Sequence, residues 1–174
     1  MNRVYRPPRL LEPADQLDAF ECRSAEQTRW LHQHAHQAHA IGTSKVLVVT
    51  HADSHDVVAY YAWCMASIGA ADAPPRLRKG AGRYPQPVAL LARLGVDVAH
   101  ERRGLGAGML ADVIARTAEL GTDIGCRGLL IHAESPAARD LYLHLIPELM
   151  QSPTDELHLV LLMKDIRRTL GTGR

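Results

Sequence analysis

The chain has 174 residues, 47% of them hydrophobic and 22% charged, and a formal net charge of +1 at pH 7. These values are typical of one soluble globular domain over residues 1–174, and they exclude a globally basic nucleic-acid binder while allowing a local basic patch. Three widely spaced cysteines, and no apolar run near the roughly twenty residues of a membrane span, predict a reduced, cytoplasmic protein with no membrane partner.

The first predicted elements are a short edge strand and one long helix. Prolines interrupt residues 1–17, which we expect to form the edge strand and a turn. Ser24, with Gln27 three residues later, is a capping-box signature. A helix is therefore predicted from there to about Ala40, and Gly42 is expected to end it.

Two buried strands and a long connection follow. Residues 45–50 and 57–65 are apolar and rich in β-branched and aromatic side chains, and residues 53–56 have the composition of a hairpin turn. Residues 69–87 contain four prolines and four basic residues. A connection of this length in a compact domain is usually functional or mobile.

The second half of the chain alternates strands and helices. A strand is predicted over residues 88–98, and the next helix begins at about Gly104 and follows its apolar period past Gly121 to Gly125. The remaining predicted elements are a strand over residues 127–133, a helix over residues 136–146 begun by Ser135 and Pro136, a strand over residues 157–163 and a polar tail over residues 164–174. This order predicts an α+β fold with a mixed central sheet and helices on both faces.

A glycine-rich turn joins the strand over residues 88–98 to the helix after it. The turn comprises Arg102, Arg103, Gly104, Leu105, Gly106, Ala107 and Gly108. Its backbone N–H groups would lie at a helix N-terminus, where the helix dipole is positive, and that geometry favours a phosphate group. The stretch alone is equally compatible with a tight turn that needs glycine only for its backbone conformation. Its spacing matches neither the nucleotide-triphosphate loop nor the dinucleotide fingerprint.

The residues on either side of the turn carry a further pattern. Leu94-Gly95-Val96 precedes Glu101-Arg102-Arg103-Gly104-Leu105-Gly106, which fits Gln/Arg-x-x-Gly-x-Gly/Ala after a strand ending in Leu-x-Val. This pattern resembles the GNAT superfamily of acyl-CoA-dependent N-acyltransferases. Glu101 stands where that family usually has Gln or Arg, so the contact expected from the loop is by backbone N–H groups.

The resemblance implies the GNAT fold and acetyl-CoA as co-substrate. The pantetheine arm would pair with the strand backbone at Leu94, Gly95, Val96 and Val98. The pyrophosphate would lie on the turn, with Arg102 or Arg103 adding charge. Ser135 and Ala138, at the start of the following helix, would also contact the cofactor.

Tyr142 is the candidate catalytic residue. It ends Ala138-Arg139-Asp140-Leu141-Tyr142, which matches the family pattern Ala-x-x-Phe/Leu-Tyr. After an amine attacks the thioester, the departing thiolate needs a proton, and a tyrosine with a pKa of about 10 can supply one to a thiol of about 8.5. A backbone N–H near Val96 would polarise the carbonyl. Most helical tyrosines only pack, so the assignment depends on the place of Tyr142 after the glycine turn.

Two further stretches carry a narrower resemblance. Residues 92–97 read Ala-Arg-Leu-Gly-Val-Asp, and residues 131–134 read Ile-His-Ala-Glu. They are similar to the Leu-Ala-Arg-Leu-Ala-Val-Asp strand and the Val-His-Ala strand end of the GNAT toxins of toxin–antitoxin pairs, which acetylate the α-amine of aminoacyl-tRNA. The resemblance covers roughly residues 20–165. It implies a toxin that halts translation, a ribbon-helix-helix antitoxin as its partner and a homodimer.

Such toxins need a basic surface for tRNA. Four basic residues of the long connection and one on the strand before the turn are the candidates: Arg76, Arg78, Lys79, Arg83 and Arg93. Lys and Arg contact RNA phosphates without regard to sequence. A basic cluster of this size is as often only a solvated loop.

No metal site is predicted from the histidines. His32 and His36 share a helix face at i, i+4, but the pattern offers no third ligand. Two alternatives to the toxin stay open. One is acetyl transfer to a protein or small-molecule amine, and the other is a CoA-bound module that acts chiefly in an antitoxin–DNA repressor complex.

Overall fold

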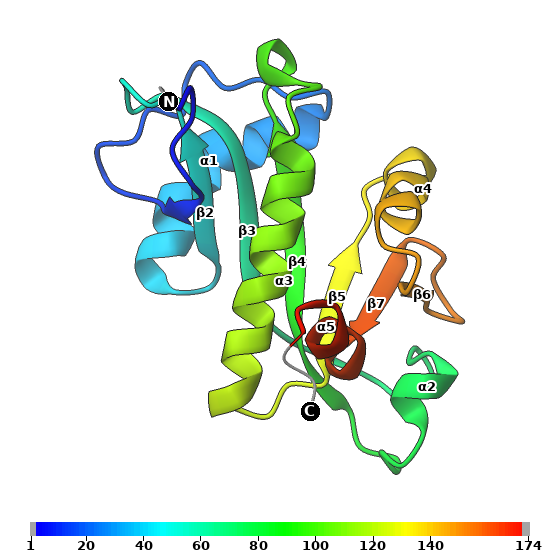
Figure 1. The fold of residues 1–174 in the computed structure, drawn as a ribbon. Helices are drawn as coiled ribbons and strands as arrows, with labels where there is room; N and C mark the ends of the chain where they lie inside the picture. Colours follow the sequence, from blue (N-terminus) through cyan, green and yellow to red (C-terminus); the bar gives the residue numbers. More distant parts are fainter. Residues whose placement is uncertain (1–2, 172–174) are drawn as a thin grey trace. The chain divides into compact units, whose positions relative to one another are not determined.

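The computed structural model describes residues 3–171, and its contacts divide the chain into two compact units. The first unit runs up to Cys64 and includes Ala92–Asp112, and the second comprises Met65–Leu91 and the chain from Val113 onward. Strands β3 (Val57–Ile68) and β4 (Gln86–Val96) and helix α3 (Leu105–Asp123) contribute residues to both units (Figure 1).

The strands form one mixed sheet in the order β1-β2-β3-β4-β5-β7-β6. Strands β4 and β5 pair in parallel, whereas β1–β2, β2–β3, β5–β7 and β6–β7 are antiparallel. The other elements are β1 (Arg9–Leu10), α1 (Ala25–Ile41), β2 (Lys45–Thr50), α2 (Pro75–Arg78), the 3-10 turn η1 (Val98–His100), β5 (Gly128–His132), α4 (Pro136–Leu145), β6 (Met150–Gln151), β7 (His158–Leu162) and α5 (Met163–Thr169). This confirms the predicted α+β class with a mixed sheet.

Two neighbouring tyrosines of β3 show how the first unit is layered. Successive side chains of a strand point to opposite faces. The Tyr60 hydroxyl donates to the backbone oxygen of Gln27 on α1 at 2.7 Å, and the Tyr61 hydroxyl donates to the carboxylate of Asp112 on α3 at 2.8 Å. The two helices therefore lie on opposite faces of the strand, as predicted.

Helix α1 begins and ends where its capping residues indicate. The Ser24 hydroxyl accepts a hydrogen bond from the N–H of Gln27 at 3.1 Å, and Gly42 ends the helix with a φ of 82°. The buried face of α1 joins residues of the N-terminal segment and of β2 and β3. The resulting apolar cluster comprises Leu11, Leu17, Phe20, Cys22, Leu31, Ala35, Val46, Val48, Val57 and Tyr60.

The second unit has an apolar cluster of its own, which explains one departure from the prediction. Its members are Ile68, Ala73, Leu77, Val88, Leu130, Val160 and Leu162. The long connection predicted over residues 69–87 contains helix α2, which was not predicted and which inserts the fully buried Leu77 into the cluster.

The predicted polar tail also differs from the structure. Helix α5 occupies Met163–Thr169 and buries Ile166 completely, whereas residues 172–174 of that tail lie outside the described residues. Helix α3 continues past Gly121, as predicted. A Cβ at Gly121 would lie 2.5 Å from the Met163 Cε atom, so the Met163 side chain of α5 packs directly over this glycine of α3. None of the described helices is long and apolar enough to cross a membrane.

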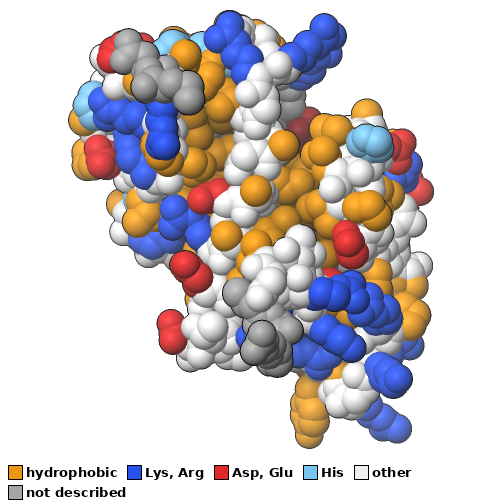
Figure 2. All heavy atoms as spheres, viewed as in Figure 1, with side chains coloured by type: hydrophobic (Ala, Val, Ile, Leu, Met, Phe, Trp, Pro, Cys, Tyr) orange, Lys and Arg blue, Asp and Glu red, His pale blue; other side chains and the backbone are white. Residues whose placement is uncertain are grey.

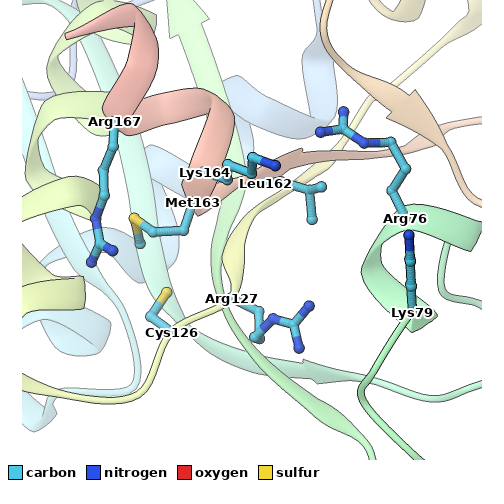
Figure 3. A pocket seen from close by; sticks show the side chains of 8 residues that line it. All are labelled: Arg76, Lys79, Cys126, Arg127, Leu162, Met163, Lys164 and Arg167. Carbon is cyan, nitrogen blue, oxygen red and sulfur yellow. The ribbon is translucent and has the colours of Figure 1, made fainter. Parts of the chain in front are cut away.

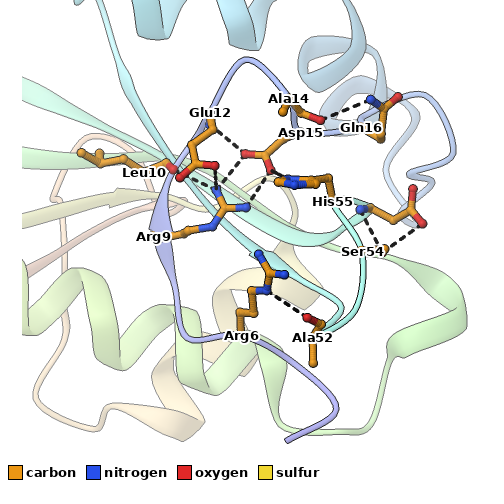
Figure 4. A network of polar contacts seen from close by, with 11 residues as sticks. Arg6, Arg9, Leu10, Glu12, Ala14, Asp15, Gln16, Ala52, Ser54 and His55 are labelled. Atoms are coloured by element: carbon orange, nitrogen blue, oxygen red, sulfur yellow. Dashed lines mark hydrogen bonds and ion pairs between the residues drawn. The ribbon is translucent and has the colours of Figure 1, made fainter.

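A buried carboxylate fixes the N-terminal segment (Figure 4). Arg9 donates two hydrogen bonds to Asp15, at 2.7 and 2.8 Å, and the Glu12 N–H and His55 Nδ1 lie 2.7 and 3.3 Å from the same carboxylate. Burial disfavours the charged form, but the hydrogen bonds together outweigh it and lower the pKa of Asp15. Since Arg9 occupies both oxygens, the cluster of Glu12, Asp15 and His55 is an ion-pair network and not a metal site.

We expect Asp15→Asn to lower the free energy of unfolding by about 3 kcal/mol at pH 7, because Arg9 loses its charged partner. The pKa of Asp15 is lower in the folded state, so its stabilisation is complete above the unfolded value of about 4 and is lost as the pH falls through the folded value. Urea unfolding at pH 7 and at about pH 3 measures this difference between wild type and variant. A difference that does not shrink at the lower pH would contradict the assignment.

Candidate active site

The glycine turn forms an exposed loop at the head of α3. Arg102 and Gly104 have φ values of 60° and 80°, and Arg102 is the only non-glycine residue of the described chain with a positive φ. Leu105, Gly106 and Ala107 then begin a 19-residue helix, so their N–H groups lack acceptors within the helix. A strained turn followed by the open N-terminus of a long helix presents several N–H donors to an anion.

The space over this turn is open. A Cβ at Gly104 or Gly108 would meet nothing within 4 Å, and one at Gly106 would meet only Val96 Cγ2, at 3.7 Å. Residues 102–104 and 107–108 are exposed. A pyrophosphate could therefore approach the backbone without displacing a side chain.

Strand β4 presents alternate residues to two different surroundings. Leu94 and Val96 are partly exposed, and Val96 lies beside Gly106 of the turn. Gly95 is buried, and a Cβ there would lie 3.1 Å from the Tyr60 ring and 3.3 Å from Phe20. The structure thus brings Val96 to the turn, while Gly95 packs against the Tyr60 and Phe20 rings.

The strand ends earlier than predicted, which affects Val98. Strand β4 stops at Val96, and the Asp97 carboxylate caps η1 by accepting a hydrogen bond from the Ala99 N–H at 2.8 Å. The N–H of Val98 donates to the backbone oxygen of Glu21 at 2.9 Å. The prediction of a strand through residue 98 is therefore wrong, and Val98 lacks the extended backbone and free N–H needed for strand pairing with a pantetheine arm.

An arginine neutralises the charge of Glu101, the acidic residue at the start of the turn. Arg23 donates to both carboxylate oxygens of Glu101, at 2.7 and 2.9 Å. These hydrogen bonds lower the pKa of Glu101, so its carboxylate is charged and paired. The ion pair explains how an acidic residue at this position is compatible with an anion site next to it.

Tyr5 and His100, which were not among the predicted site residues, position the Arg103 side chain. The Arg103 guanidinium donates to the Tyr5 hydroxyl oxygen at 3.0 Å, and that oxygen lies 2.8 Å from His100 Nδ1. Burial lowers the pKa of His100, which favours a neutral ring that accepts the Tyr5 proton. Tyr5 precedes Arg103 by 98 positions, so no local pattern could indicate the contact.

Tyr142 lies on α4, in the second unit, and its hydroxyl is kept neutral. Ser135 caps this helix by accepting a hydrogen bond from the Ala138 N–H at 3.1 Å. Tyr142 is partly exposed, but the protein around it and the negative charge of Glu134 raise its pKa to about 12. Among residues 3–171 its hydroxyl has no hydrogen-bond partner. It is a protonated donor that the fold does not itself use.

The candidate RNA-contacting residues separate into two groups. Arg93 belongs to the first unit, where its guanidinium carbon lies 5.2 Å from the centre of the Trp30 ring. The other four belong to the second unit and are all exposed: Arg76, Arg78, Lys79 and Arg83. Arg76 and Lys79 line one cavity together, and Arg76 also pairs with the buried Asp165 at 2.8 Å.

The chain is similar to a known toxin over nearly its whole length. No protein-family model matches the chain. A tRNA-acetylating toxin of Mycobacterium tuberculosis is 40% identical over 167 residues, which cover 96% of this chain and 98% of that toxin.

Solved structures with less sequence identity share the fold. A mutant of KacT has a TM-score of 0.88 at 17% identity, over 96% of this chain and 99% of its own. AtaT complexed with acetyl-methionyl-tRNAfMet has a TM-score of 0.86 at 19% identity, over 95% and 99%. An AtaT mutant bound to the C-terminus of the antitoxin AtaR and acetyl-CoA has a TM-score of 0.80 at 20% identity, over 96% and 98%. The predicted GNAT architecture is confirmed.

Proposed function

The chain belongs to the family of tRNA-acetylating toxins, and on that premise we propose that it transfers acetyl from acetyl-CoA to the α-amine of aminoacyl-tRNA and so inhibits translation. The premise rests on the 40% identity over nearly the whole chain. The observation that carries the proposal is the exposed turn at the head of α3, where Arg102 and Gly104 have positive φ values and the first N–H groups of the helix lack acceptors within it.

The donor-binding role is assigned to the turn and to the residues before it. Backbone N–H groups of residues 103–107 bind the pyrophosphate, since the Gly108 N–H donates to the Gly104 carbonyl at 2.9 Å, and Arg102 and Arg103 add charge, the latter held by Tyr5. The backbone at Leu94 and Val96 pairs with the pantetheine arm. Ser135 and Ala138 contact the cofactor from the start of α4. Acetyl-CoA supplies an acetyl group already activated as a thioester.

The chemistry asks for one neutral amine and one proton donor. An α-amino group with a pKa of about 8 is partly neutral at cytoplasmic pH, so its lone pair can attack the thioester carbonyl without a strong base. A backbone N–H near Val96 polarises the carbonyl oxygen. The carbon–sulfur bond then breaks, an amide forms, and one amine proton ends on the sulfur.

Tyr142 is assigned the proton transfer to sulfur. With a pKa of about 12 its hydroxyl is protonated at neutral pH, and giving up that proton to a thiolate of about 8.5 is unfavourable on its own. The hydroxyl therefore acts as a relay. It donates its proton to the departing sulfur while the ammonium proton of the attacking amine replaces it, so no free phenolate forms.

Further partners follow from the family. We assign a ribbon-helix-helix antitoxin and a homodimeric state to this chain, with the cytoplasm, where aminoacyl-tRNA is made and used, as its place of action. The binding of the antitoxin AtaR by an AtaT mutant of the same fold supports an antitoxin as a partner.

The experiment that tests the function uses labelled acetyl-CoA with total charged tRNA, and with the same tRNA after deacylation. We expect label in the RNA fraction only with charged tRNA, because only the charged form carries an α-amine. Mild alkali, which cleaves the aminoacyl ester, should release that label. Absence of label on charged tRNA would refute the proposal, as would equal labelling of the deacylated sample.

A further inference from the structure

The second unit contains a strongly cationic cavity of about 460 Å³ (Figure 3). Of its eight lining residues, five carry a positive charge and none is acidic, although the whole chain has a net charge of only +1. The five are Arg76, Lys79, Arg127, Lys164 and Arg167. They come from α2 and the residue after it, from the residue before β5 and from α5, so the fold gathers them from three separate segments. Figure 2 shows Lys and Arg side chains clustered over α2 and α5.

Several of these charges are not compensated by a carboxylate. The Arg127 guanidinium donates to the Gln86 side-chain oxygen at 3.1 Å and to the Leu77 carbonyl at 3.2 Å, and both acceptors are neutral. Arg127 is thus fixed in place while keeping its full charge. Within residues 3–171, Lys79 and Lys164 have no ion-pair partner.

One buried carboxylate organises the walls of the cavity. Asp165 has no exposed side-chain surface, and it binds Arg76 at 2.8 Å and Arg168 at 3.0 Å. The first of these contacts ties α2 to α5. In Figure 3 the ends of Arg76, Lys79, Arg127 and Lys164 face a common space. Because the walls are held before any ligand arrives, less ordering is required on binding.

The lining chemistry favours phosphate over a base or a peptide. No aromatic residue lines the cavity, so a nucleobase has no surface on which to stack, and only Cys126, Leu162 and Met163 are apolar. Lysines bind phosphate oxygens as point charges, and the fixed Arg127 adds positive charge beside them.

We propose that this cavity binds backbone phosphates of the tRNA substrate, an inference that rests on the proposed function. It adds Arg127, Lys164 and Arg167 to the RNA-contacting residues and groups them with Arg76 and Lys79. Phosphate contacts position an RNA without reading its sequence, so the cavity sets affinity for tRNA and not the choice among tRNAs.

The test is the double variant Lys79→Gln with Lys164→Gln, titrated with deacylated tRNA at several salt concentrations. Both lysines are exposed, so their loss leaves the core intact. We expect affinity to fall about tenfold or more at low salt, and the slope of log K against log salt to decrease by about two, one for each lost contact. With aminoacyl-tRNA, KM for the RNA should rise while kcat and KM for acetyl-CoA stay unchanged.

The matched control is Arg29→Gln with Lys45→Gln, which removes the same charge from exposed positions of the first unit. It should bind tRNA within about twofold of wild type, since only bulk charge changes. The proposal would be overturned if the Lys79 and Lys164 double variant also bound tRNA within twofold of wild type, or if the control lost as much affinity as the double variant. If wild type acetylates charged tRNA and the double variant Lys79→Gln with Lys164→Gln binds tRNA with wild-type affinity, only the cavity proposal fails. If wild type acetylates no tRNA, the proposed function fails, and the deacylated-tRNA titration decides the cavity by itself.

Discussion

Tyr142→Phe is expected to lower kcat for acetyl transfer by about 100- to 10,000-fold, the range for loss of a positioned proton donor. The ring that packs in the protein is retained, and the hydroxyl has no hydrogen-bond partner among the described residues, so its removal breaks no contact of the fold. Affinity for acetyl-CoA and for deacylated tRNA should stay within about twofold, and toxicity on expression should disappear. Steady-state kinetics and binding titrations measure the two effects separately.

Tyr84→Phe is the matched control, because Tyr84 is 80% exposed and has no proposed role. It should retain wild-type kcat. An unchanged kcat in Tyr142→Phe would remove Tyr142 from the mechanism.

The pH profile adds a check on the same residue. Because burial raises the pKa of Tyr142 to about 12, its hydroxyl stays protonated through about pH 10. The wild-type rate should therefore rise as the α-amine loses its proton near about pH 8 and then level off. A decline between about pH 9 and 10 that is absent from Tyr142→Phe would contradict the raised pKa.

Gly108→Asp should weaken acetyl-CoA binding by about 100-fold or more. Two unit charges about 4 Å apart repel by about 4 kcal/mol at an effective dielectric constant of about 20, and salt reduces this toward the 2.7 kcal/mol of a 100-fold loss. The added Cβ would meet nothing within 4 Å, and an acidic residue near a helix N-terminus favours the helix. Isothermal titration with CoA measures the affinity, and urea unfolding measures stability.

Gly125→Asp provides the control for added charge at a glycine. A Cβ at Gly125 also meets nothing within 4 Å, and this residue lies beyond the other end of α3. Its affinity for CoA should match wild type. Equal weakening in both variants, or none in Gly108→Asp, would remove the turn from the pyrophosphate site.

Local signals account for the elements that could be predicted from the sequence. Ser24 and Gly42 delimit α1, and Ser135 begins α4, because caps act within one turn of the helix they close. Helices α2 and α5 could not be predicted in this way. They are short, and they form because Leu77 and Ile166 become buried against other parts of the fold.

The candidate site also has one part that local sequence signals indicate and another that forms only on folding. The turn over residues 102–108 is contiguous, so its glycines and flanking strand indicate it directly. The contact of Arg103 with Tyr5 and the gathering of Arg127 with Lys79 and Lys164 join distant segments. In the sequence Arg127 is only the first residue of a predicted strand, and the cavity it lines exists only in the folded chain.

The most direct test of the central claim is to identify the acetylated atom. Charged tRNA treated with the protein and acetyl-CoA is digested by nuclease, and the terminal aminoacyl-adenosine is analysed by fragmentation mass spectrometry. We predict one added acetyl group, on the α-nitrogen of the amino acid. An unmodified aminoacyl-adenosine, or acetyl on a base, a ribose or a side chain instead, would contradict the account.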